Sequence, residues 1–383
     1  MGTHSRHGLL QIADLLEADG EDFTKRLFAR LFVRYPDVRD MFPASMKQHR
    51  DILLEILLHA LRALPTTESH EALIEFVAQL GRDHRKFGVV QLHYDAIRTT
   101  LYDEIVYTCG ADQLDEDDLA LIDQTTHMLT GIMRGAAESD PTPARRSARV
   151  VEVLRPSRDL TIVRLVAGES MIFRAGQYVE TQIPQLPRYW RTYSIAMPPN
   201  TQGHLEFHIR SVPNGWVSRI IHQETQPGDI WEFGQIHGQM RVDGSRPVTM
   251  VAGGTGLAPM KSILMQMSIE ADNPLVHLIV GARSPGALYD AEALGAIAST
   301  NPWLRVTQVT DERRDPWWMD DPAPPHRALS LRHGTVVDAI NGLDLQGQQV
   351  LISGPPAMVT AAVEAAQRAG ANPQRILHDP LRH

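Results

Sequence analysis

The sequence of 383 residues contains a single cysteine, Cys109. One thiol excludes an internal disulfide, and it excludes an iron–sulfur cluster, which needs several thiolates. Any metal must therefore be held mainly by other side chains, and 17 histidines are present. No apolar run reaches the ~18 residues of a membrane span, so we expect no integral membrane segment and a cytoplasmic location. The formal net charge of −9 and the lack of a basic patch argue against a nucleic-acid partner.

The length of the chain predicts several domains, because a single hydrophobic core stops growing at ~250–300 residues. We predict an all-α domain over residues 1–140, an antiparallel β-barrel domain over 145–243 and an α/β domain with a parallel sheet over 244–383. The polar, proline-bearing stretch 139–147 is the expected linker after the first domain. We expect the protein to be a monomer.

In the first region, apolar residues recur at helical spacing between proline and glycine breaks, which predicts five or more helices and no strands. Pro36 is placed to begin a short helix that runs to Phe42. One helical stripe contains His49, and another contains Phe76 and His84, so we expect these side chains to face the core. A lone inward histidine is more often a hydrogen-bonded core residue than a metal ligand. Two of them, with a phenylalanine ahead of the first, form a more specific pattern.

The stretches 31–43 and 80–87 resemble the globin domain of flavohaemoglobins, in which a haem lies between two helices. The resemblance implies that His84 is the proximal ligand of a haem b and that Tyr94 orients its imidazole. It also implies that Phe42 packs on the haem edge, that His49 is the distal polar residue and that Leu53 lies over the iron.

Two positions depart from that family. Phe28 stands where typical flavohaemoglobins have a distal tyrosine, so the hydrogen bond to dioxygen falls to His49, where the family more often has glutamine. The family's proximal carboxylate is expected near Ala136 or Ala137, and the nearest acid is Glu138. An anionic partner makes a proximal imidazole more basic, so we expect both changes to alter the reaction rate while leaving haem binding intact.

After the linker, the hydrophobic period changes to two, which predicts the small antiparallel barrel. Residues 204–210, for example, alternate as a half-buried strand does. The stretch 191–194, Arg-Thr-Tyr-Ser, offers a guanidinium for a phosphate, a ring for an isoalloxazine and a hydroxyl for a flavin edge; alone, it could equally be an ordinary strand. Residues 215–218 enter a short helix whose first N–H groups can meet a pyrophosphate, although a plain strand-to-helix turn would look the same. The candidate flavin-binding residues are Tyr178, Arg191, Thr192, Tyr193, Ser194, Gly215, Val217 and Ser218.

From residue 247 the pattern becomes strand, loop and helix, which predicts the parallel sheet. The buried strand 248–252 leads into Gly-Gly-Thr-Gly and then a helix, a context in which glycines let the backbone approach a phosphate. Another strand ends at Gly354, and ligands bind at such strand ends. Arg283 could pair with the 2′-phosphate of NADPH or be a solvated loop arginine, and the two interpretations weigh evenly. The candidate nicotinamide-binding residues are Gly253, Gly254, Thr255, Gly256, Arg283, Gly354, Pro355 and Met358.

Together these motifs resemble the ferredoxin-NADP reductase superfamily over about 145–383, and with the helical region the whole chain is similar to flavohaemoglobins. The resemblance implies that NAD(P)H reduces FAD, that FAD reduces haem b, and that nitric oxide and O2 are converted to nitrate. Flavin is required because hydride carries two electrons while haem iron accepts one at a time. Two alternatives stay open: a haem or flavin oxidoreductase with a different acceptor, favoured by Phe28, and a globin sensor of oxygen or redox state.

The C-terminus departs from the reductase superfamily, which commonly places an aromatic ring there against the flavin. Residues 376–383 contain no Phe, Tyr or Trp. His378 or His383 could take that place, and the sequence favours neither.

Overall fold

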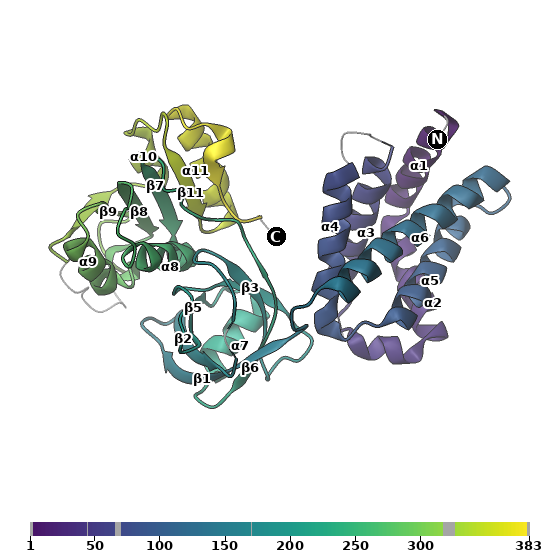
Figure 1. The fold of residues 1–383 in the computed structure, drawn as a ribbon, viewed down its shortest axis with the longest axis horizontal. Coiled ribbons are helices and arrows are strands. Elements are labelled where there is room, and N and C mark those ends of the chain that lie inside the picture. The colour runs from purple at the N-terminus through teal and green to yellow at the C-terminus, as the bar shows by residue number, and fades with distance from the viewer. Residues whose placement is uncertain (1–2, 44, 66–69, 170, 317–325, 381–383) are drawn as a thin grey trace. The chain divides into compact units, whose positions relative to one another are not determined.

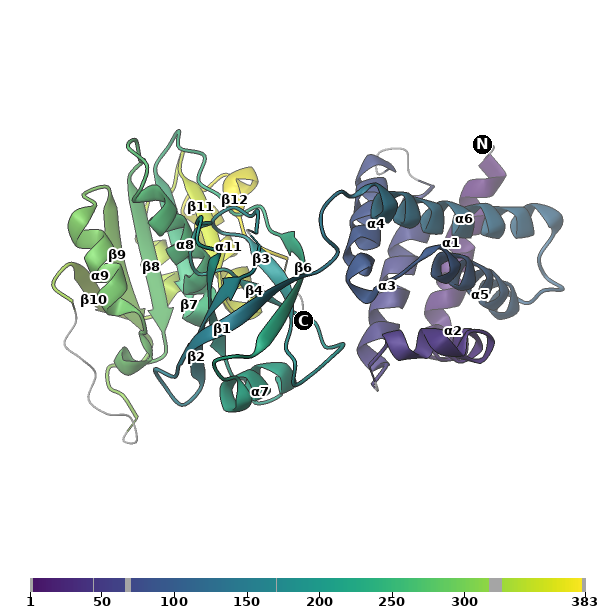
Figure 2. The ribbon, with the colours of Figure 1, turned by 60° about the horizontal axis from the view of Figure 1, so that its bottom comes forward.

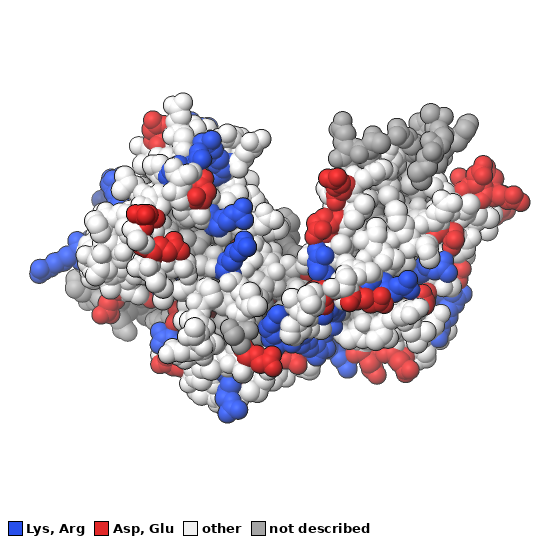
Figure 3. All heavy atoms as spheres, in the orientation of Figure 1, with Lys and Arg blue, Asp and Glu red and all other residues white. Residues whose placement is uncertain are grey.

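The computed structural model describes residues 3–43, 45–65, 70–169, 171–316 and 326–380. The chain divides into two compact units, Met1–Arg145 and Arg146–His383 (Figures 1 and 2). Acidic and basic side chains are interspersed on the face of the described residues that Figure 3 shows. Among the described residues, no helix has both the length and the apolar character needed to cross a membrane.

The first unit consists of helices, and its described residues contain no strand, as predicted. Its elements are α1 (Thr3–Ala18), α2 (Gly20–Arg34), the 3-10 turn η1 (Pro36–Met41), α3 (Lys47–Ala63), α4 (His70–His84), the 3-10 turn η3 (Arg85–Phe87), α5 (Gln91–Cys109) and α6 (Glu116–Ser139). Pro36 begins η1 as predicted, because its fixed φ suits the first helical position. Asp115 caps α6 by accepting the backbone N–H of Asp118 at 2.8 Å.

Close packing of α4 on α6 depends on Gly81, where a Cβ would overlap the backbone of Met133. This contact fixes the last turn of α4, which ends at His84. The prediction that Phe76 faces the core is wrong: its side chain is 40% exposed and lies against the ring of His59 at 5.4 Å. The core-facing stripe of α4 is narrower than the apolar pattern suggested.

In the second unit, six of the described strands form an antiparallel sheet in the order β4-β3-β6-β1-β2-β5. The elements of this part are β1 (Arg146–Leu154), β2 (Leu160–Ala167), β3 (Tyr178–Gln182), β4 (Arg191–Ser194), β5 (His204–Arg210), α7 (Trp216–Glu224) and β6 (Ile230–His237). The chain just after edge strand β4 meets edge strand β5 at a single bridge, Ile195 to Phe207. Closure of this sheet into a barrel stays a prediction.

The prediction that β5 is half-buried is wrong. Leu205, Phe207 and Ile209 point into the core as expected, but Glu206 and His208 on the opposite face are buried as well. The reason is that this second face is covered by α8 and by the segment before α9, which contact Glu206 and His208 through polar groups.

Six further described strands form a parallel sheet in the order β10-β9-β8-β7-β11-β12. The elements of this part are β7 (Val248–Gly253), η4 (Gly254–Gly256), α8 (Leu257–Met267), β8 (Val276–Ala282), η5 (Pro285–Ala287), α9 (Ala291–Thr300), β9 (Leu304–Thr310), β10 (Leu329–His333), α10 (Val336–Asn341), β11 (Gln349–Ser353), α11 (Pro356–Arg368), η6 (Pro373–Arg375) and β12 (Ile376–Leu377). Met250 packs with α8 and α9, while its neighbour Val251 packs with α10 and α11, so helices cover both faces (Figure 1). The strand order reverses at β7, which is where ligands bind in such sheets.

Candidate functional site

The two predicted glycine loops lie against each other at the carboxyl ends of β7 and β11. These strands are parallel neighbours, with Ala252 opposite Ser353. A Cβ on Gly256 would overlap the carbonyl of Ser353, and a Cβ on Gly253 would stand 2.7 Å from Cε of Met358. Gly256 is therefore required by the close approach of the loops, because the Ser353 carbonyl is backbone, whereas the flexible Met358 side chain at Gly253 could move aside. Helix α8 begins at this place, and N–H groups at the beginning of a helix can bind a pyrophosphate.

Arg283 lies at the predicted strand end, just after β8. Its side chain is 83% exposed, and its Nε donates to a carboxylate oxygen of Glu312 at 2.8 Å. The backbone N–H of Glu312 also donates to the carbonyl of Arg283 at 2.7 Å. A 2′-phosphate would have to compete with Glu312 for the guanidinium.

The predicted flavin residues of β3 and β4 are neighbours in the antiparallel sheet. Tyr178 lies directly opposite Ser194, and Val179 lies opposite Tyr193. Since side chains alternate along a strand, Tyr178 and Ser194 share one face of the sheet. Tyr193 packs against the core of the sheet, while Arg191 is exposed.

Residues 215–218 begin α7 as predicted. Gly215 is the N-cap residue, and the Ser218 hydroxyl donates to its carbonyl at 3.1 Å. Val217 is buried in the core, so its side chain serves packing and only its backbone faces the helix start. α7 packs on β5 and β2.

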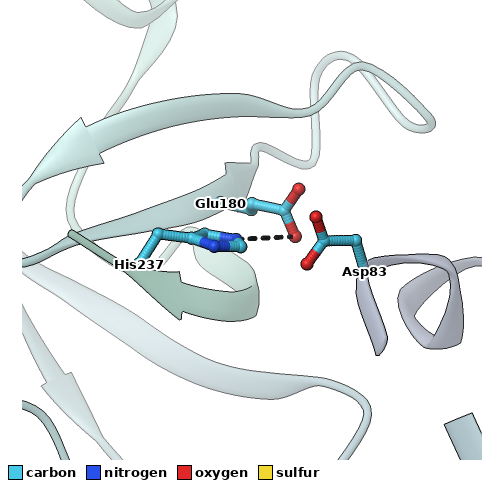
Figure 4. A group of neighbouring side chains, drawn as sticks. All are labelled: Asp83, Glu180 and His237. Atoms are coloured by element: carbon cyan, nitrogen blue, oxygen red, sulfur yellow. Dashed lines mark ion pairs between the residues drawn. The ribbon is translucent and has the colours of Figure 1, made fainter. Parts of the chain in front are cut away.

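Two residues beside Tyr178, His237 and Asp379, were not predicted from the sequence. The ring of His237 stacks on the ring of Tyr178 at 5.5 Å, and its Nε2 lies 4.0 Å from an oxygen of Glu180. Figure 4 shows His237 and Glu180 facing each other. A Cβ on Gly238 would stand 3.1 Å from an oxygen of Asp379 and 3.2 Å from the Tyr178 ring. Tyr178 and His237 are neighbours because β3 and β6 pair in this register. A single sequence does not give the register of two strands, so this pair could not be predicted.

The C-terminal segment thus brings Asp379 to the Tyr178 edge. Burial raises the pKa of this carboxyl to about 6. His378 is exposed, and its Nδ1 bonds to the carbonyl of Asp379 at 2.9 Å. His383, the other residue considered from the sequence, lies outside the described residues.

The helical unit gathers the predicted distal residues into a ring cluster. The ring centres of Phe28 and Phe42 lie 5.5 Å apart, and those of Phe42 and His49 lie 5.8 Å apart. The ring of Phe32 contacts the rings of Phe28 and Phe42. Phe28 is buried, and Leu53 packs against the same core. Among Phe28, Phe32, Phe42 and Leu53 no side chain offers a polar atom, so the polarity of the cluster comes from His49.

On α4, the imidazole of His84 is oriented by its own helix. Nδ1 lies 2.6 Å from the carbonyl oxygen of Leu80, which can only accept, so Nδ1 carries the proton and Nε2 carries the lone pair. Phe87 packs edge-on at 5.9 Å. A neutral imidazole of this tautomer suits a haem iron, which takes one protein nitrogen on its proximal side.

Tyr94 and Glu138 form the second part of the predicted proximal group. Tyr94 is buried, and its hydroxyl makes no hydrogen bond within the described residues. Burial, with the negative charge of Glu138 adding to it, raises the pKa of Tyr94 to about 12. The Tyr94 hydroxyl thus keeps its proton at neutral pH. It could donate a hydrogen bond to an acceptor on a bound cofactor.

Comparison with known proteins decides the family of the second unit. A model described as oxidoreductase FAD-binding domain matches residues 147–241, and one described as oxidoreductase NAD-binding domain matches residues 250–364. The ferredoxin–NAD(P)(+) reductase component of the naphthalene 1,2-dioxygenase system of Pseudomonas putida is 32% identical over 235 residues, covering 60% of this chain and 67% of that protein. The chain belongs to the ferredoxin reductase family of FAD- and NAD-binding oxidoreductases.

This ferredoxin reductase-type oxidoreductase also has relatives that match its helical unit. The flavohemoprotein of Bordetella pertussis is 24% identical over 312 residues, covering 76% of this chain and 78% of that one. A flavohemoglobin structure from Malassezia yamatoensis, with bound FAD and heme, has a TM-score of 0.76 and 17% identity over 100% of this chain and 99% of that one. The second likeness shows the fold alone. The chain spans 62% to 67% of the length of three curated reductase components that it matches.

The ferredoxin reductase-type chain is therefore an NAD(P)H-dependent oxidoreductase with FAD- and NAD-binding domains. The predictions of a multidomain fold, with a helical region, an antiparallel sheet and a parallel sheet, are confirmed.

Proposed function

We propose that the chain is a nitric oxide dioxygenase of the flavohaemoglobin type. In the net reaction, two NO and two O2 react with one NAD(P)H to give two nitrates, one NAD(P)+ and one proton. When bound, FAD accepts a hydride and releases electrons singly, and haem b accepts single electrons and supplies the iron for O2 chemistry. The proposed domains are residues 1–140 for haem, 145–243 for FAD and 244–383 for NAD(P)H.

The orientation of His84 is the observation that carries the haem proposal. Its Nδ1–H donates to Leu80, so in the neutral ring Nε2 is the nitrogen that would bind iron. Such a hydrogen bond fixes the ring and makes the nitrogen ligand more basic. The match to the flavohemoprotein supports the same assignment: it covers 76% of this chain, more than residues 146–383 contain, and so extends into the helical unit.

The distal side is assigned to the ring cluster. His49 would donate the hydrogen bond to dioxygen, because Phe28, Phe42 and Leu53 have no donor. Tyr94 and Glu138 are assigned to the proximal side. Because Nδ1 of His84 donates to Leu80 and the Tyr94 hydroxyl makes no hydrogen bond within the described residues, Leu80 orients the imidazole. Tyr94 would then act as a buried donor near the site, with the negative charge of Glu138 beside it.

In the reductase unit, the exposed Arg191 is assigned to the flavin phosphates, and Tyr178, Tyr193 and Ser194 to the isoalloxazine. The beginning of α7 and the two glycine loops are assigned to pyrophosphates, because N–H groups at helix starts bind anions. The remaining assigned residues are Thr192, Gly215, Val217 and Ser218 for FAD and Gly253, Gly254, Thr255, Gly256, Arg283, Gly354, Pro355 and Met358 for NAD(P)H.

A second candidate is an NAD(P)H-dependent reductase that delivers electrons to an acceptor other than nitric oxide. The observation that favours it is the ring cluster, in which Phe28 provides no hydroxyl for dioxygen. Similarity to reductase components of oxygenase systems points the same way.

The test is NADH and NADPH oxidation in air by haem- and FAD-loaded protein, before and after nitric oxide is added. We expect nitric oxide to stimulate oxidation by about tenfold or more, with nitrate formed in proportion. His84→Ala should abolish the stimulation and keep NADH-driven reduction of ferricyanide, which needs only the flavin half. If wild-type protein reduces ferricyanide but shows no response to nitric oxide, the dioxygenase proposal fails and the second candidate takes its place.

A further inference from the structure

Lys261 is a buried lysine on α8, one turn beyond the Gly253–Gly256 loop. Its side chain is 9% exposed, and its ammonium lies 2.6 Å from an oxygen of Asp290 and 3.0 Å from an oxygen of Glu206. A lysine is almost never fully buried unless it is paired, because removing its charge from water is costly. Two carboxylates from separate parts of the chain therefore share one cation. Burial opposes the charge, but both carboxylates outweigh it and raise the pKa of Lys261.

Glu206, on β5, forms the other end of this link. Its carboxylate accepts hydrogen bonds from Lys261, from Nε2 of His208 at 2.9 Å and from Nε of Arg164 at 2.7 Å. Burial opposes ionisation of Glu206, yet His208, Lys261 and Arg164 lower its pKa well below the ordinary range. Glu206 is thus a fully bonded anion with a fixed place on β5.

A second contact joins the same two regions. Because Nε2 of His208 donates to Glu206, the other nitrogen of the neutral ring accepts the Tyr289 hydroxyl at 3.1 Å. The next residue, Asp290, has a φ of 62°, in the left-handed region that residues other than glycine seldom adopt. Its ion pair with Lys261 helps to hold this backbone conformation.

Strand β5 lies between the residues assigned to flavin and the nucleotide loop. The carbonyl of Glu206 accepts the N–H of Ala196 at 2.8 Å, two residues after Ser194. At the end of β5, Nε of Arg210 lies 3.9 Å from the place of a Cβ on Gly254. The Glu206–Lys261 contact therefore connects the flavin strand with the helix that carries the loop.

We propose that Lys261 is a positioning residue for hydride transfer from NAD(P)H to FAD. By joining Glu206 to Asp290, its ammonium holds the glycine loop in place relative to β4. Hydride transfer needs reacting atoms about 3–3.5 Å apart, so a misplacement of about 1 Å costs about 100-fold in rate. The inference rests on the FAD- and NAD-binding domains and not on haem or nitric oxide, so it and the dioxygenase proposal can fail separately.

A purely structural role for Lys261 makes a different prediction. Breaking a buried ion pair destabilises a fold wherever it lies. If stability were its whole contribution, loss of Lys261 would lower Tm and FAD content without changing the hydride-transfer rate of the molecules that keep FAD.

The experiment compares Lys261→Met with wild type in FAD-loaded full-length protein. Anaerobic stopped-flow reduction of the flavin by NADH gives the limiting rate and the nucleotide Kd, and hydrogen–deuterium exchange gives the protection of residues 253–257 and 204–210. We expect the limiting rate to fall by about tenfold or more while Kd changes less than about threefold. Exchange should rise in both segments, because each end of the link is released.

Glu104→Gln is the matched control, because Glu104 is a fully buried carboxylate paired with Arg26 at 2.6 Å and Arg30 at 3.2 Å in the helical unit. It should lower Tm and leave flavin reduction unchanged. Lys261→Arg, which keeps the charge, should recover part of the rate, and Asp290→Asn serves if Lys261→Met does not retain FAD. An unchanged limiting rate, a change in Kd alone, or increased exchange confined to residues 253–257 would overturn the proposal.

Discussion

Asp379 is a half-buried carboxyl group that the fold brings beside a residue far away along the chain, Tyr178. It lies beside the Tyr178 ring, at the place where β3 pairs with β4. Burial raises its pKa from the ordinary 3.8 to about 6, and the nearby His378 and His237 only partly oppose this change. Its charge therefore changes within the range of pH in which the protein would be assayed.

The raised pKa predicts that Asp379→Asn stabilises the protein more at pH 7.5 than at pH 4.5. A raised carboxyl pKa means that the fold favours the protonated form, so the free energy of unfolding falls as pH rises from about 4 to about 6. The asparagine removes this cost, which is of order 1–3 kcal/mol because one pKa unit equals about 1.4 kcal/mol. Tm of both proteins across this pH range is the measurement.

The control for this prediction is Asp112→Asn, the same substitution at an exposed loop position. If Asp379→Asn changed Tm equally at both pH values, or at neither, the pKa of Asp379 would not be raised in the folded protein.

Among the helices and strands, those features that depend on residues close together in the sequence could be predicted. Strand, glycine turn and helix follow one another within residues 248–267, so this unit can be predicted from its own residues. The alternation of β5 was equally clear, but it led to a wrong expectation for Glu206 and His208. Their burial depends on Lys261 of α8, 55 positions from Glu206, and on Tyr289, 81 positions from His208. The Lys261 link was missed for the same reason.

Phe76 shows the corresponding limit for helices. The 3.6-residue period places it near the apolar stripe of α4, but which neighbours cover a helix edge depends on packing between helices. The ring of His59 lies against Phe76, and Phe76 still remains 40% exposed. In contrast, His84 and Leu80 lie four residues apart on one helix, so their contact is a local consequence of helical geometry.

The contact between the two glycine loops predicts a specific defect in Gly256→Ala. The added Cβ overlaps the Ser353 carbonyl, which is backbone and cannot rotate away, so the loops must separate. We expect the free energy of unfolding to fall by about 1–3 kcal/mol. The rate of flavin reduction by NADH should also fall, with FAD content unchanged.

Gly168→Ala is the control, since a Cβ at Gly168 has open space around it. Stopped-flow flavin reduction at the wild-type rate in Gly256→Ala would show that the close contact of the loops is not needed for nucleotide binding.

For the whole molecule, changes of hydrophobic period along the chain predicted the sequence of helical, antiparallel and parallel regions, because each period follows from the geometry of one element type. The helical unit orients His84 through its own backbone, and the reductase unit joins its flavin strand to its nucleotide loop through Glu206 and Lys261. The proposed order of electron flow, from NAD(P)H through FAD to haem, is the order of these parts from the C-terminus to the N-terminus.

The most direct test of this account is an anaerobic absorbance spectrum of the purified haem- and FAD-loaded protein, recorded over time after NADH is added. The account predicts that the flavin absorbance bleaches first and that the haem bands then change from ferric to ferrous, with His84→Ala losing the haem bands and retaining flavin bleaching. A flavin that bleaches while the haem stays ferric, or wild-type protein that takes up no haem, would contradict it.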